Sequence, residues 1–234
     1  MRIALFLVFL LFFSMAFAQT LTGAWKMKTS NGNEVIKIFS ENYFMTGACT
    51  SEGRFLYASG GTYTFKGNTL TETYDFFTAD STVTGTSRSY AVKLSRQSMN
   101  LSSGTTKEEW SRADEGATVL SGAWRFAARV NDNNTVGERR SADSPRQTIK
   151  ILSGKHFQWA AFNSQTKQFM GTGGGTYTVT DGKYTENIRF FSRDDSRSGL
   201  SLTFDCRIDG NDWYHKGKGT TGNPVYEVWE RLKR

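Results

Sequence analysis

The chain has 234 residues, with 29 lysines and arginines against 22 aspartates and glutamates, a formal net charge of +7. Aromatic residues make up 14% of it, which excludes an intrinsically disordered protein, because such chains are poor in aromatic side chains. Two cysteines cannot define a disulfide scaffold. The two histidines, His156 and His215, are too few for a histidine-rich metal site. We therefore expect no metal and no cofactor.

The first 18 residues have the parts of a secretory signal peptide. Arg2 supplies the positive start, residues 3–13 (IALFLVFLLFF) form an apolar run, and Ala16-Phe17-Ala18 has the small-x-small pattern that precedes cleavage. The apolar run is short for a membrane span, although a retained anchor is the alternative. We expect cleavage after Ala18 and a secreted or periplasmic protein with no membrane span after cleavage. Loss of Arg2 lowers the net charge to +6.

The remaining sequence contains two copies of one pattern. LTGAW recurs as LSGAW, IKI recurs unchanged, and each copy closes with Trp-x-Arg. The longest match pairs GGTYTFKGNTLTETYDFF at 60–77 with GGTYTVTDGKYTENIRFF at 174–191. Four matches in the same order indicate a tandem duplication. The predicted organisation is a signal peptide at 1–18, repeat 1 at 19–113, a linker at 114–119 and repeat 2 at 120–234.

The second copy is longer mainly between Phe126 and Arg146. This segment is polar, has no apolar period of its own and ends at Pro145. It predicts a long exposed loop or an extended hairpin.

Within each copy the hydrophobic pattern is typical of β-strands. Runs such as 35–39 (VIKIF) and 62–65 (TYTF) mix β-branched and aromatic residues, and turn signals such as Lys66-Gly67-Asn68 separate them. We predict an all-β protein of two tandem antiparallel meander β-barrels, with about eight strands in each. Charged residues occur throughout the strands, which argues against a transmembrane barrel.

These features resemble the calycin group, which includes lipocalins, fatty-acid-binding proteins and avidins. The Gly-x-Trp motifs at 23–25 and 122–124 and an arginine near the end of each copy carry the resemblance. The sequence of the repeat is most similar to that of lipocalin-like domains of uncharacterised bacterial secreted proteins. Beyond Thr-Gly-x-Trp nothing matches the biotin contacts of avidins, so biotin binding is not expected.

The resemblance implies specific structural roles. Trp25 would pair with Arg112, and Trp124 with Arg231, each pair closing one end of a barrel. A guanidinium over an indole face is a favourable cation–π contact, and it can also donate to nearby backbone carbonyls. The resemblance further implies a fold that binds a ligand, but it does not identify that ligand.

Four residues are the candidates for binding a ligand. Glu72 and Glu186 occupy matched positions in Thr-Glu pairs, and Tyr63 and Tyr177 are matched in the same way. One carboxylate and one phenol in an otherwise apolar pocket would orient a ligand. The alternative is a surface glutamate on an alternating strand and a tyrosine in the core.

Three other features of the sequence are typical of binding or reactive sites in some proteins. The run Gly171 to Gly175 enters a strand, whereas phosphate-binding loops need a helix N-terminus. Its glycines are expected to permit a sharp bend in a small barrel. Cys49 and Cys206 lie at unmatched positions and are either two buried thiols or a bridge between the copies. Arg139-Arg140 is interrupted by polar neighbours, which favours a solvated loop.

The leading hypothesis is non-catalytic binding of a small hydrophobic or amphipathic ligand inside one or both barrels. The alternative is an interaction module with solid-packed barrels, in which a loop such as Arg129 to Ser144 contacts an envelope protein or a glycan. The sequence contains no nucleophile, acid–base or metal constellation that predicts an enzyme. No nucleic-acid-binding module is recognisable, so no nucleic-acid partner is expected.

Overall fold

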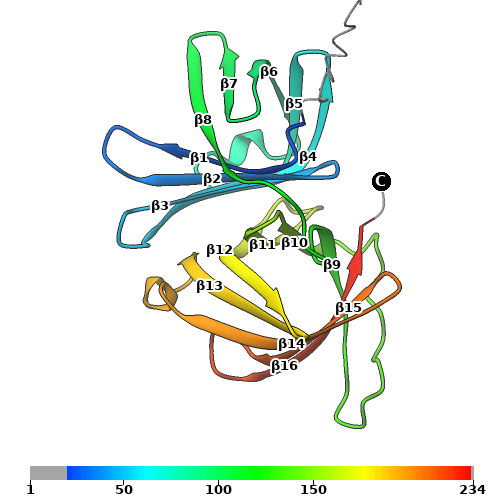
Figure 1. Cartoon of the computed structure of the whole chain (residues 1–234). Coiled ribbons are helices and arrows are strands. Elements are labelled where there is room, and N and C mark those ends of the chain that lie inside the picture. Colours follow the sequence, from blue (N-terminus) through cyan, green and yellow to red (C-terminus); the bar gives the residue numbers. More distant parts are fainter. Residues whose placement is uncertain (1–19, 233–234) are drawn as a thin grey trace, which may run out of the picture.

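A computed structural model describes residues 20–232 and consists of two closed antiparallel β-barrels in tandem (Figure 1). Each barrel has eight strands, every strand pairs with its neighbour in sequence, and the first strand pairs with the last. The predicted fold class is therefore confirmed. The predicted signal peptide lies outside the described residues.

Corresponding strands of the two copies differ in length by at most two residues. Barrel 1 consists of β1 (Gly23–Lys28), β2 (Glu34–Ser40), β3 (Tyr43–Cys49), β4 (Phe55–Lys66), β5 (Thr69–Phe77), β6 (Ser87–Leu94), β7 (Ser98–Ser103) and β8 (Thr106–Asp114). Barrel 2 consists of β9 (Gly122–Arg129), β10 (Arg146–Leu152), β11 (His156–Asn163), β12 (Phe169–Thr180), β13 (Lys183–Phe191), β14 (Ser201–Asp209), β15 (Asp212–Lys218) and β16 (Pro224–Arg231). A 3-10 turn follows β5 (η1, Ser81–Val83) and β13 (η2, Asp195–Arg197). Asp114, placed in the linker by the sequence, is the last residue of β8.

The extra segment of the second copy forms an extended hairpin beside β9. Val130 and Val136 form an isolated antiparallel bridge. The amide of Arg140 donates to the carbonyl oxygen of Ala127 at 2.7 Å, which attaches the returning limb to the strand. Of the two forms that the sequence predicts for this segment, the structure contains the hairpin.

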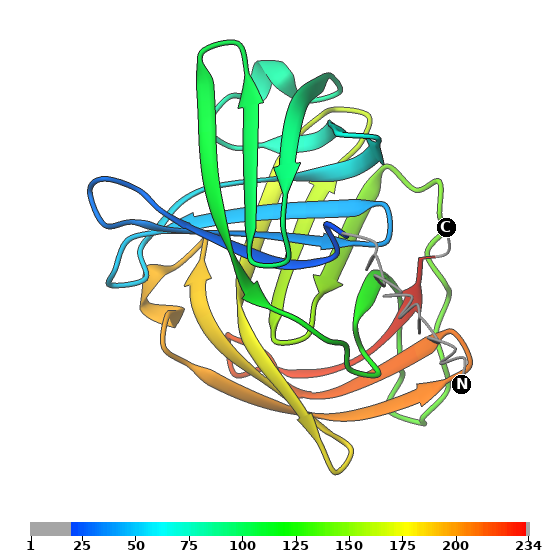
Figure 2. The same cartoon turned by 45° about the horizontal axis from the view of Figure 1, so that its top comes forward.

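The two barrels pack against each other through the outer faces of β2 and β3 in barrel 1 and of β10 and β11 in barrel 2. In Figures 1 and 2, the sheet of β2 and β3 lies against the sheet of β10 and β11, and these strands are in contact. Ile38 and Ile151, the last residues of the two IKI motifs, both belong to the apolar cluster between the barrels. Strand alternation therefore turns the central lysines, Lys37 and Lys150, into the barrel interiors.

A β-bulge at the same place in both copies supplies aromatic residues to two cores. The register of β4 and β5 shifts where Gly60 opposes Phe76 and Gly61 opposes Tyr74. The bulged residue lets Phe76 face the other barrel while Phe77 packs inside its own. The ring of Phe76 lies 5.6 Å, between centroids, from that of Phe162 in barrel 2.

The glycine pair opposite the bulge is required by close approach. In barrel 2, a Cβ on Gly175 would lie 2.0 Å from the carbonyl oxygen of Asn187. A Cβ on Gly174 would lie 2.8 Å from the ring of Phe190. Glycine is therefore required at these positions because of close contacts with a carbonyl oxygen and a ring, a more specific reason than the predicted bend of the barrel.

Each barrel is closed at one end by the tryptophan and arginine that the resemblance implied. The Arg112 guanidinium carbon lies 3.8 Å from a ring centroid of Trp25, and that of Arg231 lies 4.1 Å from Trp124. Arg112 also donates to the carbonyl oxygens of three residues, including Thr22 at 2.8 Å. Both indoles are buried, and each donates its N–H to a backbone carbonyl four residues earlier at 2.8 Å.

Replacing Arg112 or Arg231 by alanine is expected to lower the free energy of unfolding by about 2 kcal/mol, because the cation–π contact and several hydrogen bonds to backbone are lost together. Differential scanning calorimetry measures the effect, and the exposed Arg54→Ala variant is the control. An unchanged melting temperature in both closure variants would contradict the structural role.

Gly175→Ala is expected to destabilise the protein by about 3 kcal/mol or more, because the new methyl group would overlap a backbone carbonyl. Gly219→Ala is the matched control, since the nearest atom to its Cβ would lie at 3.5 Å, an ordinary contact. Chemical unfolding of both variants tests the bulge, and equal stabilities would show that the backbone there relaxes freely.

Candidate functional site

Each barrel encloses one lysine–glutamate ion pair. The Nζ of Lys37 donates to Glu72 Oε1 at 2.8 Å, and the Nζ of Lys150 donates to Glu186 Oε1 at 2.7 Å. No side chain of either pair is more than 6% exposed. The two glutamates are therefore interior residues, and the structure pairs them with lysines that the sequence did not single out.

Aromatic rings surround both ammonium groups. The Lys37 Nζ lies 5.2 Å from a ring centroid of Trp110, and the Lys150 Nζ lies 4.9 Å from one of Trp229. Burial lowers the pKa of Lys37, but the neighbouring Glu72 carboxylate outweighs this effect, so that the pKa lies above its usual value. Lys37 is therefore charged at neutral pH.

The two candidate tyrosines are the register neighbours of the two glutamates on the adjacent strand. Tyr63 is the register neighbour of Glu72, and its ring packs edge-on against Phe39 at 4.9 Å between centroids. The Tyr177 hydroxyl donates to the carbonyl oxygen of Ser153, near the closed end of barrel 2. Two further tyrosines donate to the carboxylates: the hydroxyl of Tyr74 to Glu72 and that of Tyr184 to Glu186.

The open end of barrel 2 contains a cavity of about 220 Å³. It lies opposite the end that Trp124 and Arg231 close. Four aromatic side chains, one ion pair and two further polar side chains are prominent in its lining. These are Trp159, Phe191, Phe204, Trp229, Lys150, Glu186, His215 and Glu227.

His215 is the polar group of this cavity whose bonding is incomplete. Its side chain is 5% exposed, and neither ring nitrogen has a hydrogen-bond partner among the described residues. Nδ1 lies 3.8 Å from Glu227 Oε2, beyond hydrogen-bond distance. Burial lowers the pKa of His215, which favours the neutral imidazole. A buried polar group without a partner is costly, which makes His215 a candidate for binding a ligand atom.

In barrel 1 the chain's own side chains occupy the corresponding region. Val83 of η1 packs into the barrel core, where barrel 2 has Arg197 at the matched position. Leu101, also in the core, replaces His215. The hydroxyl of Tyr74 bonds the second carboxylate oxygen of Glu72 at 2.8 Å, whereas barrel 2 has an isoleucine at the matched position. The two copies thus share the ion pair and differ at the mouth.

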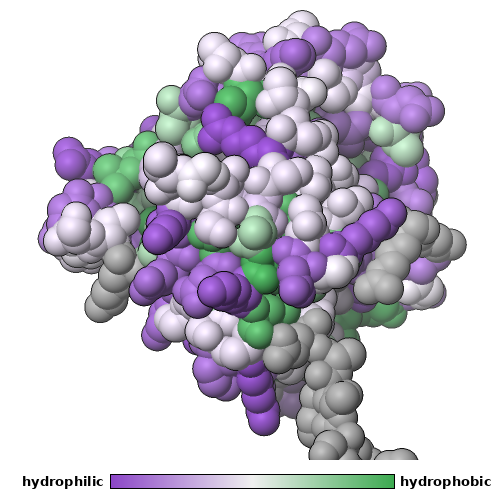
Figure 3. All heavy atoms as spheres, turned by 90° about the horizontal axis from the view of Figure 1, so that it is seen from above, coloured by the Kyte–Doolittle hydropathy of each residue, from purple (hydrophilic) through white to green (hydrophobic). Residues whose placement is uncertain are grey.

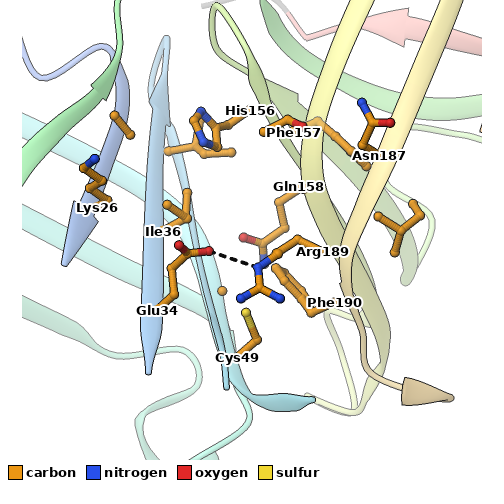
Figure 4. A pocket seen from close by; sticks show the side chains of 16 residues that line it. Lys26, Glu34, Ile36, Cys49, His156, Phe157, Gln158, Asn187, Arg189 and Phe190 are labelled. Carbon is orange, nitrogen blue, oxygen red and sulfur yellow. Dashed lines mark hydrogen bonds and ion pairs between the residues drawn. The ribbon is translucent and has the colours of Figure 1, made fainter. Parts of the chain in front are cut away.

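A second pocket, of about 440 Å³, lies between the barrels (Figure 4). Figure 4 shows Glu34 and Cys49 of barrel 1 facing Arg189 and Gln158 of barrel 2. The Arg189 Nε lies 3.3 Å from Glu34 Oε1, and its Nη2 donates to the carbonyl oxygens of residues 50 and 51. The charged groups of this pocket thus join the two barrels to each other.

A buried carboxylate strengthens the same interface. Asp114 Oδ2 accepts hydrogen bonds from the Ser153 hydroxyl at 2.7 Å and the Lys155 amide at 2.8 Å, and it lies 2.7 Å from His156 Nδ1. Burial raises the pKa of Asp114, but the hydrogen bonds from His156 and Ser153 lower it further, to about 2. Asp114 therefore acts as an ionised anchor between β8 and the β10–β11 turn.

The remaining candidate groups lie apart from one another. Cys49 and Cys206 are both free thiols, the first in the pocket between the barrels and the second beside the core of barrel 2. Burial raises the pKa of each thiol, which disfavours the reactive thiolate. Among residues 20–232, no group of three or more histidine, cysteine or acidic side chains is placed to hold a metal ion.

The outer surface offers no broad apolar patch on the face shown in Figure 3, where hydrophilic and intermediate residues dominate. Large hydrophobic residues are exposed singly, at Leu56, Val119, Val136 and Ile208. In the part of the chain that the structure describes, no helix is long and apolar enough to cross a membrane.

Comparison with known proteins adds no family assignment. A scan against protein-family models and a search of curated proteins each find no match to this chain. The resemblance to lipocalin-like domains therefore stays a prediction, and the functional argument depends on the site itself.

Asp75 provides a test of how the stability of the protein responds to pH. It occupies the bulge of β5, at the position matched by Arg189 in β13, and burial raises its pKa from 3.8 to about 6. Because the folded pKa exceeds the unfolded one, this carboxyl favours folding below about pH 4, and the contribution is lost as pH rises through about 6.

Asp75→Asn is therefore expected to stabilise the protein at pH 7.5 by about 1–2 kcal/mol relative to its effect at pH 4, because the amide carries no buried charge at either pH. Urea unfolding at the two pH values measures this difference, with the exposed Asp132→Asn variant as control. An effect of Asp75→Asn that does not change with pH would show that the carboxyl is well solvated.

Proposed function

We propose that the chain is an exported, non-catalytic binding protein that holds a small hydrophobic or amphipathic ligand in a lipocalin-like barrel, and that barrel 2 is the barrel that holds it. The observation that carries this proposal is the aromatic cavity at the open end of barrel 2, with the incompletely bonded His215 in its wall. Export rests on the signal-peptide pattern of residues 1–18.

The size of the cavity limits the ligand. An apolar cavity of about 150 Å³ accommodates benzene, and pockets for drug-sized molecules are about 300–1,000 Å³. The cavity of about 220 Å³ therefore suits a molecule with one or two rings, or a short chain, whose polar end faces the mouth.

The chemistry of the lining supports an amphipathic ligand. Trp159, Phe191 and Phe204 offer ring faces and edges to an apolar body, while His215 and Glu186 offer a hydrogen bond and a charge. A few convergent polar groups in a mainly aromatic pocket are typical of small-molecule sites.

The alternative, a solid-packed module that contacts an envelope protein or glycan, has support only in barrel 1, where Val83 and Tyr74 occupy the interior. The hairpin proposed to make such contacts uses its arginines within the molecule. Arg139 forms an ion pair with Asp212, and Arg140 lies 4.7 Å over the Phe126 ring. Ligand binding by barrel 2 is therefore the function that we favour.

Benzyl alcohol, a neutral one-ring probe, is expected to bind the full mature chain, and Leu202→Trp is expected to weaken binding at least about tenfold, because the larger side chain fills the cavity that Leu202 lines. Arg88→Trp is the control, since it introduces the same residue at the matched position in barrel 1. Titration by NMR measures both affinities. Native mass spectrometry of protein from its own host should also detect a bound small molecule. Absence of binding by benzyl alcohol and also by its charged relatives benzylamine and benzoate would overturn the proposal.

A further inference from the structure

We propose that the ligand of barrel 2 carries a positive charge, such as a protonated amine or a quaternary ammonium group, on its apolar body. This inference rests on the proposed function and names the chemical class of the ligand. The main support for this inference comes from barrel 1, where a cation of the chain itself occupies the corresponding place.

The matched positions of barrel 1 show which groups surround a cation at this place in the fold. Arg88 of β6 is the register neighbour of Glu72, so that its side chain leaves the strand on the same face as the buried carboxylate. Its guanidinium carbon lies 5.7 Å from the ring centroid of Phe77 and 5.9 Å from that of Tyr74. Its Nη2 also lies 3.5 Å from Asp80 Oδ2. The mouth of barrel 1 is thus covered by a cation that lies over aromatic rings and is paired with a carboxylate beside them.

Barrel 2 keeps one of the two rings beside this cation and the neighbouring glutamate, and it lacks the cation. Phe191 matches Phe77, and Glu186 matches Glu72, but the register neighbour of Glu186 is Leu202. All three of these barrel 2 residues line the cavity. A ligand cation at this mouth would therefore meet the ring that matches Phe77 and lie beside the carboxylate that matches Glu72.

The charged groups that line the cavity also favour a positively charged ligand, because carboxylates outnumber ammonium groups among them. Glu186 and Glu227 supply two carboxylates, and Lys150 supplies one ammonium group. Burial lowers the pKa of His215, which favours the neutral imidazole. Burial raises the pKa of Glu227, but Lys150 and the hydrogen bond from the Trp229 indole are among the influences that hold this pKa below its usual value. The cavity therefore has a net negative charge, and burying such a charge is unfavourable without a compensating cation.

Oxygen atoms remain for the ligand. The ammonium of Lys150 and the hydroxyl of Tyr184 both donate to Oε1 of Glu186, whereas Glu72 in barrel 1 uses one oxygen for each donor. Glu186 Oε2 is thus the counterpart of an oxygen that Tyr74 occupies in barrel 1. Glu227 uses Oε2 to accept from the Trp229 indole at 3.1 Å.

The arginine that barrel 2 has near its mouth does not replace the missing cation. Arg197 of η2 pairs through its Nε with Asp194 Oδ2 at 2.9 Å. Neither residue belongs to the lining of the cavity. This pair is neutral as a unit and leaves the carboxylates inside the barrel uncompensated.

Three probes with the same ring test the charge preference in the full mature chain: benzylamine, which is a cation at neutral pH, benzyl alcohol and benzoate. We expect benzylamine to bind at least about tenfold more tightly than benzyl alcohol, and benzoate to bind most weakly. Isothermal titration at low salt gives the three affinities. Equal affinities, or tightest binding of benzoate, would overturn the charge inference while leaving the proposed function intact.

Two variants assign the preference to this cavity. Glu227→Gln is expected to reduce benzylamine affinity about tenfold and to leave benzyl alcohol within twofold, because only the charge is removed. Glu108→Gln is the matched control in barrel 1, where Glu108 also accepts from a tryptophan, Trp110, at 2.9 Å. Leu202→Arg, which copies Arg88, is expected to abolish the preference by supplying the cation within the chain.

Each outcome decides between the two proposals. Loss of benzylamine preference in Glu227→Gln or in Leu202→Arg, with Glu108→Gln unchanged, supports a cation site in barrel 2. An unchanged preference in folded Glu227→Gln and Leu202→Arg would place the cation elsewhere and overturn the inference. If Glu227→Gln fails to fold, Leu202→Arg and the probe series on the unmodified chain still decide. Failure of all three probes to bind would overturn the proposed function with it.

Discussion

The β-bulge in the fifth strand of each barrel determines which residues reach which core. Without it, strict alternation would place Tyr74 and Phe76 on one face of β5, and Phe77 on the other. The bulge at Asp75 instead sends Phe76 to the other barrel and keeps both Tyr74 and Phe77 inside. The same shift in β13 exposes Phe190 to barrel 1 and places Phe191 at the mouth of barrel 2. One local irregularity thus builds the interface and one wall of the candidate site.

The architecture could be read from the sequence because its causes are local and repeated. Turn signals, β-branched runs and two copies of the same motifs predict the barrels, and the resemblance that the Gly-x-Trp and Trp-x-Arg motifs carry implies the closure pairs. Packing confirms those pairs, since each guanidinium lies within about 4 Å of its indole. The boundary of repeat 1 was placed one residue early because Asp114, a polar residue, reads as linker although it is a buried anchor.

The polar interior could not be read in the same way. Strands β2 and β10 are buried on both faces, so alternation does not show which face of IKI is inside its own barrel. The lysines and their glutamates are 35 and 36 residues apart, a separation with no pattern. His215 was noted only as one of two histidines, because a lone histidine on a strand has no distinguishing neighbour. A signal did exist: Lys37 and Lys150 recur inside a repeated apolar motif, where a charge needs a partner.

The duplication also separates structural from functional requirements. A feature kept in both copies, such as the buried ion pair, is needed to complete either barrel. Features that differ concentrate at the mouth, where Val83, Leu101 and Tyr74 of barrel 1 correspond to an arginine, a histidine and an isoleucine in barrel 2. The tyrosine that binds the glutamate follows it by two residues in barrel 1 and precedes it by two in barrel 2. Moving this hydroxyl releases a carboxylate oxygen and opens space toward the mouth. The same ion pair is therefore a closed network in the first barrel and the base of an open site in the second.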